Sequence, residues 1–73
     1  MSNLPVISGE TCLRALLKLG YRFIRQKGSH LVVRKDSPFS QIVVPNHKVL
    51  DRGTLRSIIK QTGMSVEEFS QFI

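Results

Sequence analysis

The sequence predicts an α+β fold in which a three-stranded antiparallel sheet carries helices on one face. Apolar residues recur at helical spacing before residue 20 and again after residue 53, whereas the stretch between them alternates as strands do. Short connections separate the expected strands, which favours an antiparallel meander. A chain of 73 residues has room for one core, so we expect a single domain over residues 1–73.

The first helix is expected to begin after Ser8, whose side chain suits an N-cap, and to end near Leu19 before Gly20. Three leucines form its apolar stripe: Leu13, Leu16 and Leu17. Cys12 flanks this stripe, and we interpret it as a small core residue. As the single cysteine of the chain, it permits no internal disulfide.

Three strands are expected over residues 21–27, 30–35 and 41–44, with a glycine turn at Gly28 and a longer turn over residues 36–40. Strict alternation divides the first strand between its two faces. One set would be Tyr21, Phe23, Arg25 and Lys27, and the other Arg22, Ile24 and Gln26.

A second helix is expected to begin after Asp51 or Gly53 and to end at Gly63. Its apolar stripe is Leu55, Ile58 and Ile59, and its basic stripe is Arg52, Arg56 and Lys60. Ser65 and Glu68 form a capping-box pattern that opens a last short helix, with Val66, Phe69 and Ile73 on its apolar side. The resulting α-β-β-β-α order is that of double-stranded RNA-binding domains, and it leaves one sheet face open.

The charge of the chain indicates a polyanionic partner. Lys and Arg number 11 against 5 Asp and Glu, which gives a net charge of +6 and a pI near 10.3. Such a surface favours nucleic acid. Two histidines and scattered carboxylates form no metal-ligand pattern, so we expect neither metal nor cofactor. We also expect no membrane segment and a cytoplasmic location, since no long apolar run or signal-peptide pattern is present.

The stretch from Gln26 to His30 carries the candidate chemistry. His30 would open the second strand, and an imidazole can give and take a proton near neutrality. RNA supplies its own nucleophile, the 2′-OH, so a protein needs only a base, an acid and cations to cleave it. Nearby cations that could stabilise the transition state are Arg22, Arg25 and Lys27. His47 is either the second proton carrier or a loop residue that contacts RNA or the partner.

Several motifs in order resemble the HicA toxins, the messenger-RNA interferases of bacterial toxin–antitoxin pairs. They are Gly20-Tyr21, Gln26-Lys27-Gly28-Ser29-His30, Val44-Pro45-Asn46-His47-Lys48, Gly53-Thr54-Leu55-Arg56, Ile59-Lys60-Gln61 and Gly63. The resemblance implies that His30 is catalytic, that the fold is the RNA-binding-domain-like one, and that a HicB antitoxin covers the active site. It also makes Lys27, Ser29 and Arg56 candidate RNA contacts.

The sequence therefore predicts a metal-independent endoribonuclease toxin that cleaves messenger RNA during stress, with His30 in acid–base catalysis. The expected RNA-binding residues are Arg22, Arg25, Lys27, Ser29, His47, Lys48, Arg56 and Lys60. A non-catalytic double-stranded RNA-binding module is the alternative. A helix-turn-helix DNA binder is disfavoured, because the last helix begins with Glu67 and Glu68 and contains no Lys or Arg.

Overall fold

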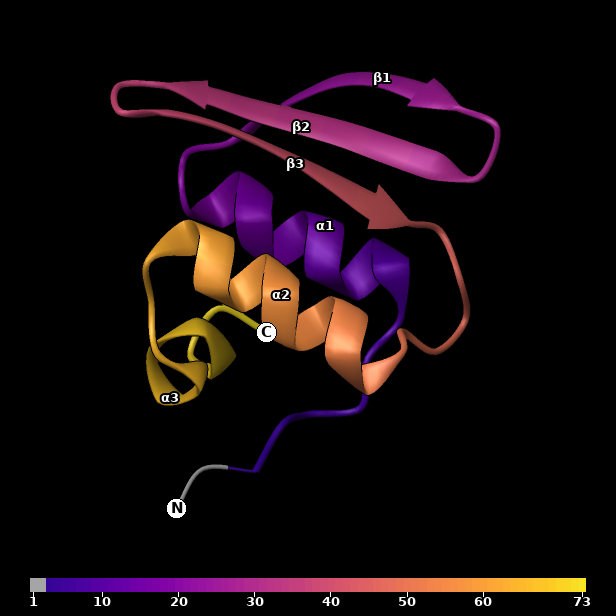
Figure 1. The fold of residues 1–73 in the computed structure, drawn as a ribbon, viewed down its shortest axis with the longest axis vertical. Helices are drawn as coiled ribbons and strands as arrows, with labels where there is room; N and C mark the ends of the chain where they lie inside the picture. The colour runs from indigo at the N-terminus through magenta and orange to yellow at the C-terminus, as the bar shows by residue number, and fades with distance from the viewer. Residues whose placement is uncertain (1–2) are drawn as a thin grey trace.

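A computed structural model describes residues 3–73 of the chain. The elements follow one another as α1 (Gly9–Lys18), β1 (Arg22–Lys27), β2 (His30–Asp36), β3 (Phe39–Pro45), α2 (Arg52–Thr62) and α3 (Val66–Ser70). The sheet order is β1-β2-β3, and both strand pairs are antiparallel. The helices lie on one side of the sheet, and no element formed by residues 3–73 covers the other side (Figure 1). The predicted α+β class and α-β-β-β-α order are confirmed.

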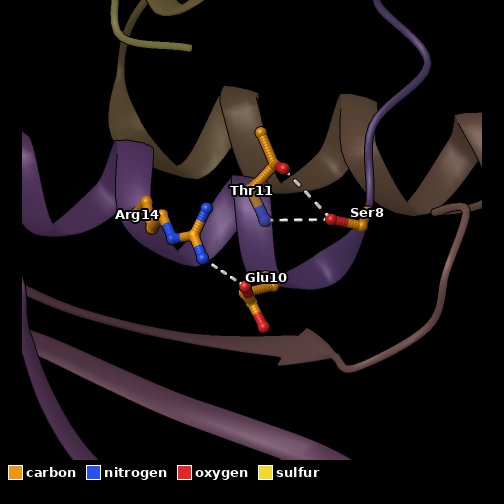
Figure 2. Close-up of polar contacts among 4 residues, drawn as sticks. All are labelled: Ser8, Glu10, Thr11 and Arg14. Carbon is orange, nitrogen blue, oxygen red and sulfur yellow. Dashed lines mark hydrogen bonds and ion pairs between the residues drawn. The ribbon is translucent and has the colours of Figure 1, made fainter.

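Local hydrogen bonds fix the start of α1, as the sequence predicts. The Ser8 hydroxyl accepts a hydrogen bond from the backbone N–H of Thr11 at 3.0 Å (Figure 2). Glu10 lies in the first turn, where a carboxylate complements the helix dipole, and pairs with Arg14 one turn later. The helix ends before Gly20, whose φ of +100° lets the chain reverse into β1.

One hydrophobic core joins both long helices to the sheet. Its buried members are Leu4, Cys12, Ala15, Leu16, Tyr21, Leu31, Val33, Ile42, Val44, Leu50, Leu55, Ile58, Ile59 and Phe69. At the C-terminus the prediction for Ile73 is wrong: this residue is 46% exposed, whereas Phe72 packs against the core. The reason is that α3 ends at Ser70, so helical spacing no longer decides which side chain points inward.

The predicted division of β1 between two faces is also wrong, because this strand contains a β-bulge. Phe23 pairs with Val33 while Arg25 pairs with the adjacent Val32, so Ile24 is an extra residue on β1. A one-residue insertion exchanges the faces of every later residue. Three cations therefore share the open face of the sheet: Arg22, Arg25 and Lys27. Phe23 and Gln26 lie on the helix side instead.

The turn between β2 and β3 is shorter than the sequence predicts. Asp36 pairs directly with Phe39, so only Ser37 and Pro38, joined by a cis peptide, connect the strands. Strand β3 consequently begins two residues earlier than expected and extends through Pro45.

Helix α2 begins after Asp51, one of the two predicted starts, and ends at Gly63 as predicted, and α3 begins after Ser65 as predicted. The Asp51 carboxylate accepts hydrogen bonds from the N–H groups of Gly53 and Thr54, and Gly63 ends α2 with a φ of +79°. Ser65 and Glu68 form the capping box of α3, with hydrogen bonds of 3.1 and 2.8 Å. No helix within residues 3–73 has the length and apolar character needed to cross a membrane.

Candidate functional site

The β1–β2 turn positions His30 at the surface. Gly28 has a φ of +60° and Ser29 does not have a positive φ, which is the pattern of a two-residue hairpin turn led by glycine. His30 is the first residue of β2 and lies directly opposite Lys27 in the antiparallel register. Side chains at such paired positions have Cβ atoms about 5 Å apart. Both side chains are exposed, so the imidazole is held by strand pairing beside a cation and remains open to solvent.

The loop after β3 is attached to this turn and to the start of α1. The N–H of Asn46 donates to the carbonyl of Ser29 at 2.6 Å, and the N–H of Gly9 donates to the carbonyl of His47 at 2.8 Å. Gly9 is buried, and a Cβ at this position would lie only 2.1 Å from the carbonyl oxygen of Pro45. The close approach of α1 to the loop therefore requires glycine.

Sequence reasoning missed the role of Gly9. A glycine in the first turn of a helix lowers helix propensity, and that cost is the signal that could have drawn attention to it. Gly9 itself has no side chain that could act on a substrate. Instead it sets the position of the loop that carries His47 and Lys48.

Five of the predicted site residues lie at one end of the molecule, where the β1–β2 turn, the end of β3 and the N-termini of both long helices lie together (Figure 1). They are Lys27, Ser29, His30, His47 and Lys48, and all five are exposed. The arrangement combines two imidazoles with two ammonium groups around a hairpin turn.

The remaining predicted contacts extend away from this end. Arg25 pairs with Val32, two residues along β2 from His30 and on the same face. Arg22 lies farther along that face and forms an exposed ion pair of 2.7 Å with Asp36. Arg56 and Lys60 project from the exposed side of α2, on the helix side of the sheet. The structure therefore separates these two α2 residues from the open sheet face.

A hollow of about 340 Å³ lies between α1 and the sheet, on the helix side. It is lined by Glu10, Leu13, Leu17, Phe23, Gln26, Leu31 and Asn46. Gln26 also donates a side-chain hydrogen bond to the carbonyl of Gly28 at 3.0 Å, which braces the turn. None of the five predicted site residues at the turn lines this hollow, although Gln26 and Asn46, which bond to the turn, do.

The sulfur of Cys12 plays no part in this site. The residue is fully buried, and desolvation raises the pKa of its thiol from 9.0 to about 12. A thiol with so high a pKa stays protonated near neutrality and is a poor nucleophile. The prediction that Cys12 is a core residue is confirmed.

Comparison with known protein families identifies the chain. The model for the HicA toxin of bacterial toxin–antitoxin systems matches residues 9–64, which include the β1–β2 turn, the loop after β3 and α2. A comparison with curated proteins gave no match. The matched segment begins at the buried Gly9 and ends one residue after Gly63, the cap of α2. The chain therefore belongs to the HicA toxin family, the toxin components of bacterial toxin–antitoxin pairs, and membership implies a cognate antitoxin as its partner.

Proposed function

We propose that this toxin is a metal-independent endoribonuclease that cleaves messenger RNA in the bacterial cytoplasm during stress, with His30 as a catalytic acid or base. The observation that carries the proposal is the exposed imidazole of His30, held at the first position of β2 opposite Lys27. A phosphodiester bound there would meet a proton carrier and a cation at the same place. The net charge of +6 favours a polyanionic substrate.

The proposed reaction uses the 2′-OH of the RNA as the nucleophile. A base removes the 2′-OH proton, the 2′-oxygen attacks the adjacent phosphorus, and the bond from phosphorus to the 5′-oxygen breaks. An acid returns a proton to that leaving oxygen, so the products carry a 2′,3′-cyclic phosphate and a 5′-OH. His30 performs one of these transfers, and His47 is the candidate for the other.

Cations on the same face would stabilise the charge that develops on the phosphorane. Lys27 is the cross-strand partner of His30, and the bulge brings Arg25 onto the same side of the sheet. Ser29 lies in the turn and Lys48 in the loop after β3, and both are proposed to bind adjacent phosphates, as is Arg22 farther along the sheet. Arg56 and Lys60 on α2 would contact only RNA that extends around to the helix side.

The cognate antitoxin is proposed to be a HicB-type protein that covers the end of the molecule around His30. Masking this basic surface would exclude RNA and silence the toxin. Expression of the toxin alone is expected to slow bacterial growth, and co-expression of the antitoxin is expected to restore it. Normal growth with confirmed expression of the folded wild-type chain would contradict the proposal.

The chemistry is tested with purified protein and a defined RNA in excess EDTA. We expect fragments with 2′,3′-cyclic phosphate ends, and we expect His30→Ala to abolish them while retaining RNA binding and the wild-type melting temperature. Val6→Ala is the control, because this exposed residue lies outside the site. Cleavage that requires a divalent ion, or that survives in His30→Ala, would refute the mechanism.

The same experiment separates the nuclease from a non-catalytic double-stranded RNA-binding module. A binding module would retain duplex RNA with a strong salt dependence and would yield no fragments at any protein concentration. In that case His30→Ala would leave every measured property unchanged.

A further inference from the structure

An exposed aromatic ring lies on the open face of the sheet, at the end far from His30. Phe39 is 67% exposed although it lies within a strand. The guanidinium carbon of Arg34 is 6.0 Å from the centre of its ring. Arg34 is itself held in place, since its Nε donates to the side-chain oxygen of Gln41 at 3.0 Å. A ring and a guanidinium plane are thus presented together to solvent.

A continuous row of paired positions connects this ring to His30. The pairs on the open face are His30 with Pro45, Val32 with Val43, Arg34 with Gln41, and Asp36 with Phe39. Six residues along β2 span about 20 Å, which is the length of a few nucleotides. One of the two pairs between these ends is apolar: Val43 is 45% exposed, and its cross-strand partner Val32 is almost buried.

Cations follow the same face along β1. The bulge places Arg22, Arg25 and Lys27 on this side, next to the apolar row on β2 and β3. Asp36 is the only acidic residue in the three strands, and Arg22 pairs with it. The face therefore combines a line of positive charge with apolar and aromatic surface, which is the combination that binds single-stranded nucleic acid.

We propose that Phe39, together with Arg34, forms a base-stacking subsite for single-stranded RNA a few nucleotides from the bond cleaved at His30. The inference rests on the proposed ribonuclease function and adds to it the strandedness and the path of the substrate. Backbone phosphates lie along Arg25 and Lys27, and one unpaired base stacks on the Phe39 ring. Duplex RNA cannot use this subsite, because the faces of its bases are already stacked.

The subsite is tested first by binding, with cleavage removed by His30→Ala. Fluorescence anisotropy compares a labelled single-stranded octanucleotide with a duplex of the same sequence. In the His30→Ala background, Phe39→Ala and Phe39→Leu are expected to weaken single-strand binding by roughly 5-fold to 150-fold, the range found for removal of one base–aromatic stack. Phe39→Tyr should retain the affinity, since it keeps the ring. Val6→Ala is the matched control, because it truncates an exposed apolar side chain outside the sheet.

A second measurement locates the subsite on the RNA. The protein with an intact His30 is given substrates that carry a single abasic nucleotide at successive distances from the cleavage site. We expect one position, a few nucleotides away, where loss of the base lowers kcat/KM in the wild type but not in Phe39→Ala. Melting temperatures verify that the variants are folded.

The outcomes distinguish the subsite from the function on which it depends. If the wild type cleaves RNA but the Phe39→Ala and Phe39→Leu proteins bind and cleave as their parents do, the subsite is refuted and the nuclease stands. The subsite is likewise refuted if these variants lose only antitoxin affinity, since the ring would then be a protein contact. If neither the wild type nor any variant binds or cleaves RNA, both the nuclease and the subsite are refuted.

Discussion

Substituting Gly9 by alanine is the sharpest test of how the loop after β3 is held. A Cβ at this position would lie 2.1 Å from the carbonyl oxygen of Pro45 and 3.0 Å from the Cα of Asn46. Both atoms belong to the backbone, so no side-chain rotation relieves the contact. The distance to the oxygen must increase to at least 3.0 Å, and this movement separates α1 from the loop.

The expected cost follows from three contributions. Overpacking against a rigid neighbour costs about 1–3 kcal/mol. Weakening the hydrogen bond from the Gly9 N–H to the His47 carbonyl costs about 1 kcal/mol more. Alanine returns up to about 1 kcal/mol through its higher helix propensity. The free energy of unfolding should therefore fall by about 2 kcal/mol, which lowers the melting temperature by roughly 8–16 °C in a domain of this size.

Thermal unfolding followed by circular dichroism measures this effect. Gly53→Ala is the matched control, because Gly53 also lies in the first turn of a helix. A Cβ there would meet only the side-chain oxygen of Asp51, at 3.2 Å, so its melting temperature should stay close to the wild-type value or rise. A Gly9→Ala protein that melts with the wild type would show that α1 and the loop do not pack as described. Its RNA cleavage should fall with stability if the loop carries His47 into the site.

Three further predictions concern single residues. Gly28→Ala should lower the free energy of unfolding by about 1–2 kcal/mol, since alanine is strained at a φ of +60°, and urea unfolding that matches the wild type would contradict this. Ser65→Ala should cost about 1 kcal/mol through loss of the α3 capping box, whereas Ser57→Ala on the exposed side of α2 should be nearly neutral in the same measurement. Burial raises the pKa of Cys12 from 9.0 to about 12. The contribution of the protonated thiol to the free energy of unfolding is therefore fully present below pH 9. It is lost as the pH rises toward 12, because the thiol ionises in the unfolded chain before it ionises in the folded protein. The slope from this group, roughly 1 kcal/mol per pH unit, should be absent in Cys12→Ala; identical slopes in both proteins would refute the assignment.

The parts of the fold that the sequence predicted are those with local causes. Ser8 and Ser65 cap their helices as predicted, because a cap needs only a side chain and the next few N–H groups. Asp51 caps α2, which settles the start of this helix between the two predicted positions. Gly28 marks the hairpin turn for a similar reason, since few other residues adopt a positive φ without cost. The core stripe of α2 follows directly from helical spacing. In α1 the predicted Leu16 is buried and Leu13 packs against the core, but the prediction for Leu17 is wrong. Leu17 is 41% exposed, because the buried side of this helix runs through Cys12, Ala15 and Leu16.

The parts that the sequence did not predict depend on distant neighbours. Nothing in residues 22–27 alone specifies the bulge at Ile24, because it is defined only by the partner residues on β2. The close contact of Gly9 with Pro45 joins segments far apart in the chain, so no local pattern reports it. Phe39 likewise belongs to β3 only because the β2–β3 turn is shorter than turn chemistry alone predicts. Its pairing with Asp36 then places it on the open face, where it is exposed.

The bulge decides which side chains the open face presents. With strict alternation, Arg22 would lie on the face opposite to Arg25 and Lys27, and the cations of β1 would be divided between the core side and the solvent side. The bulge absorbs one extra residue, Ile24, so all three cations lie on the face that carries His30. If Arg22 kept its pairing with Arg34 and the bulge were absent, Arg25 and Lys27 would turn toward the helix side, away from His30. The bulge in β1 therefore places the three cations of this strand in one row on the open face, and it brings this row to the same side of the sheet as the imidazole of His30.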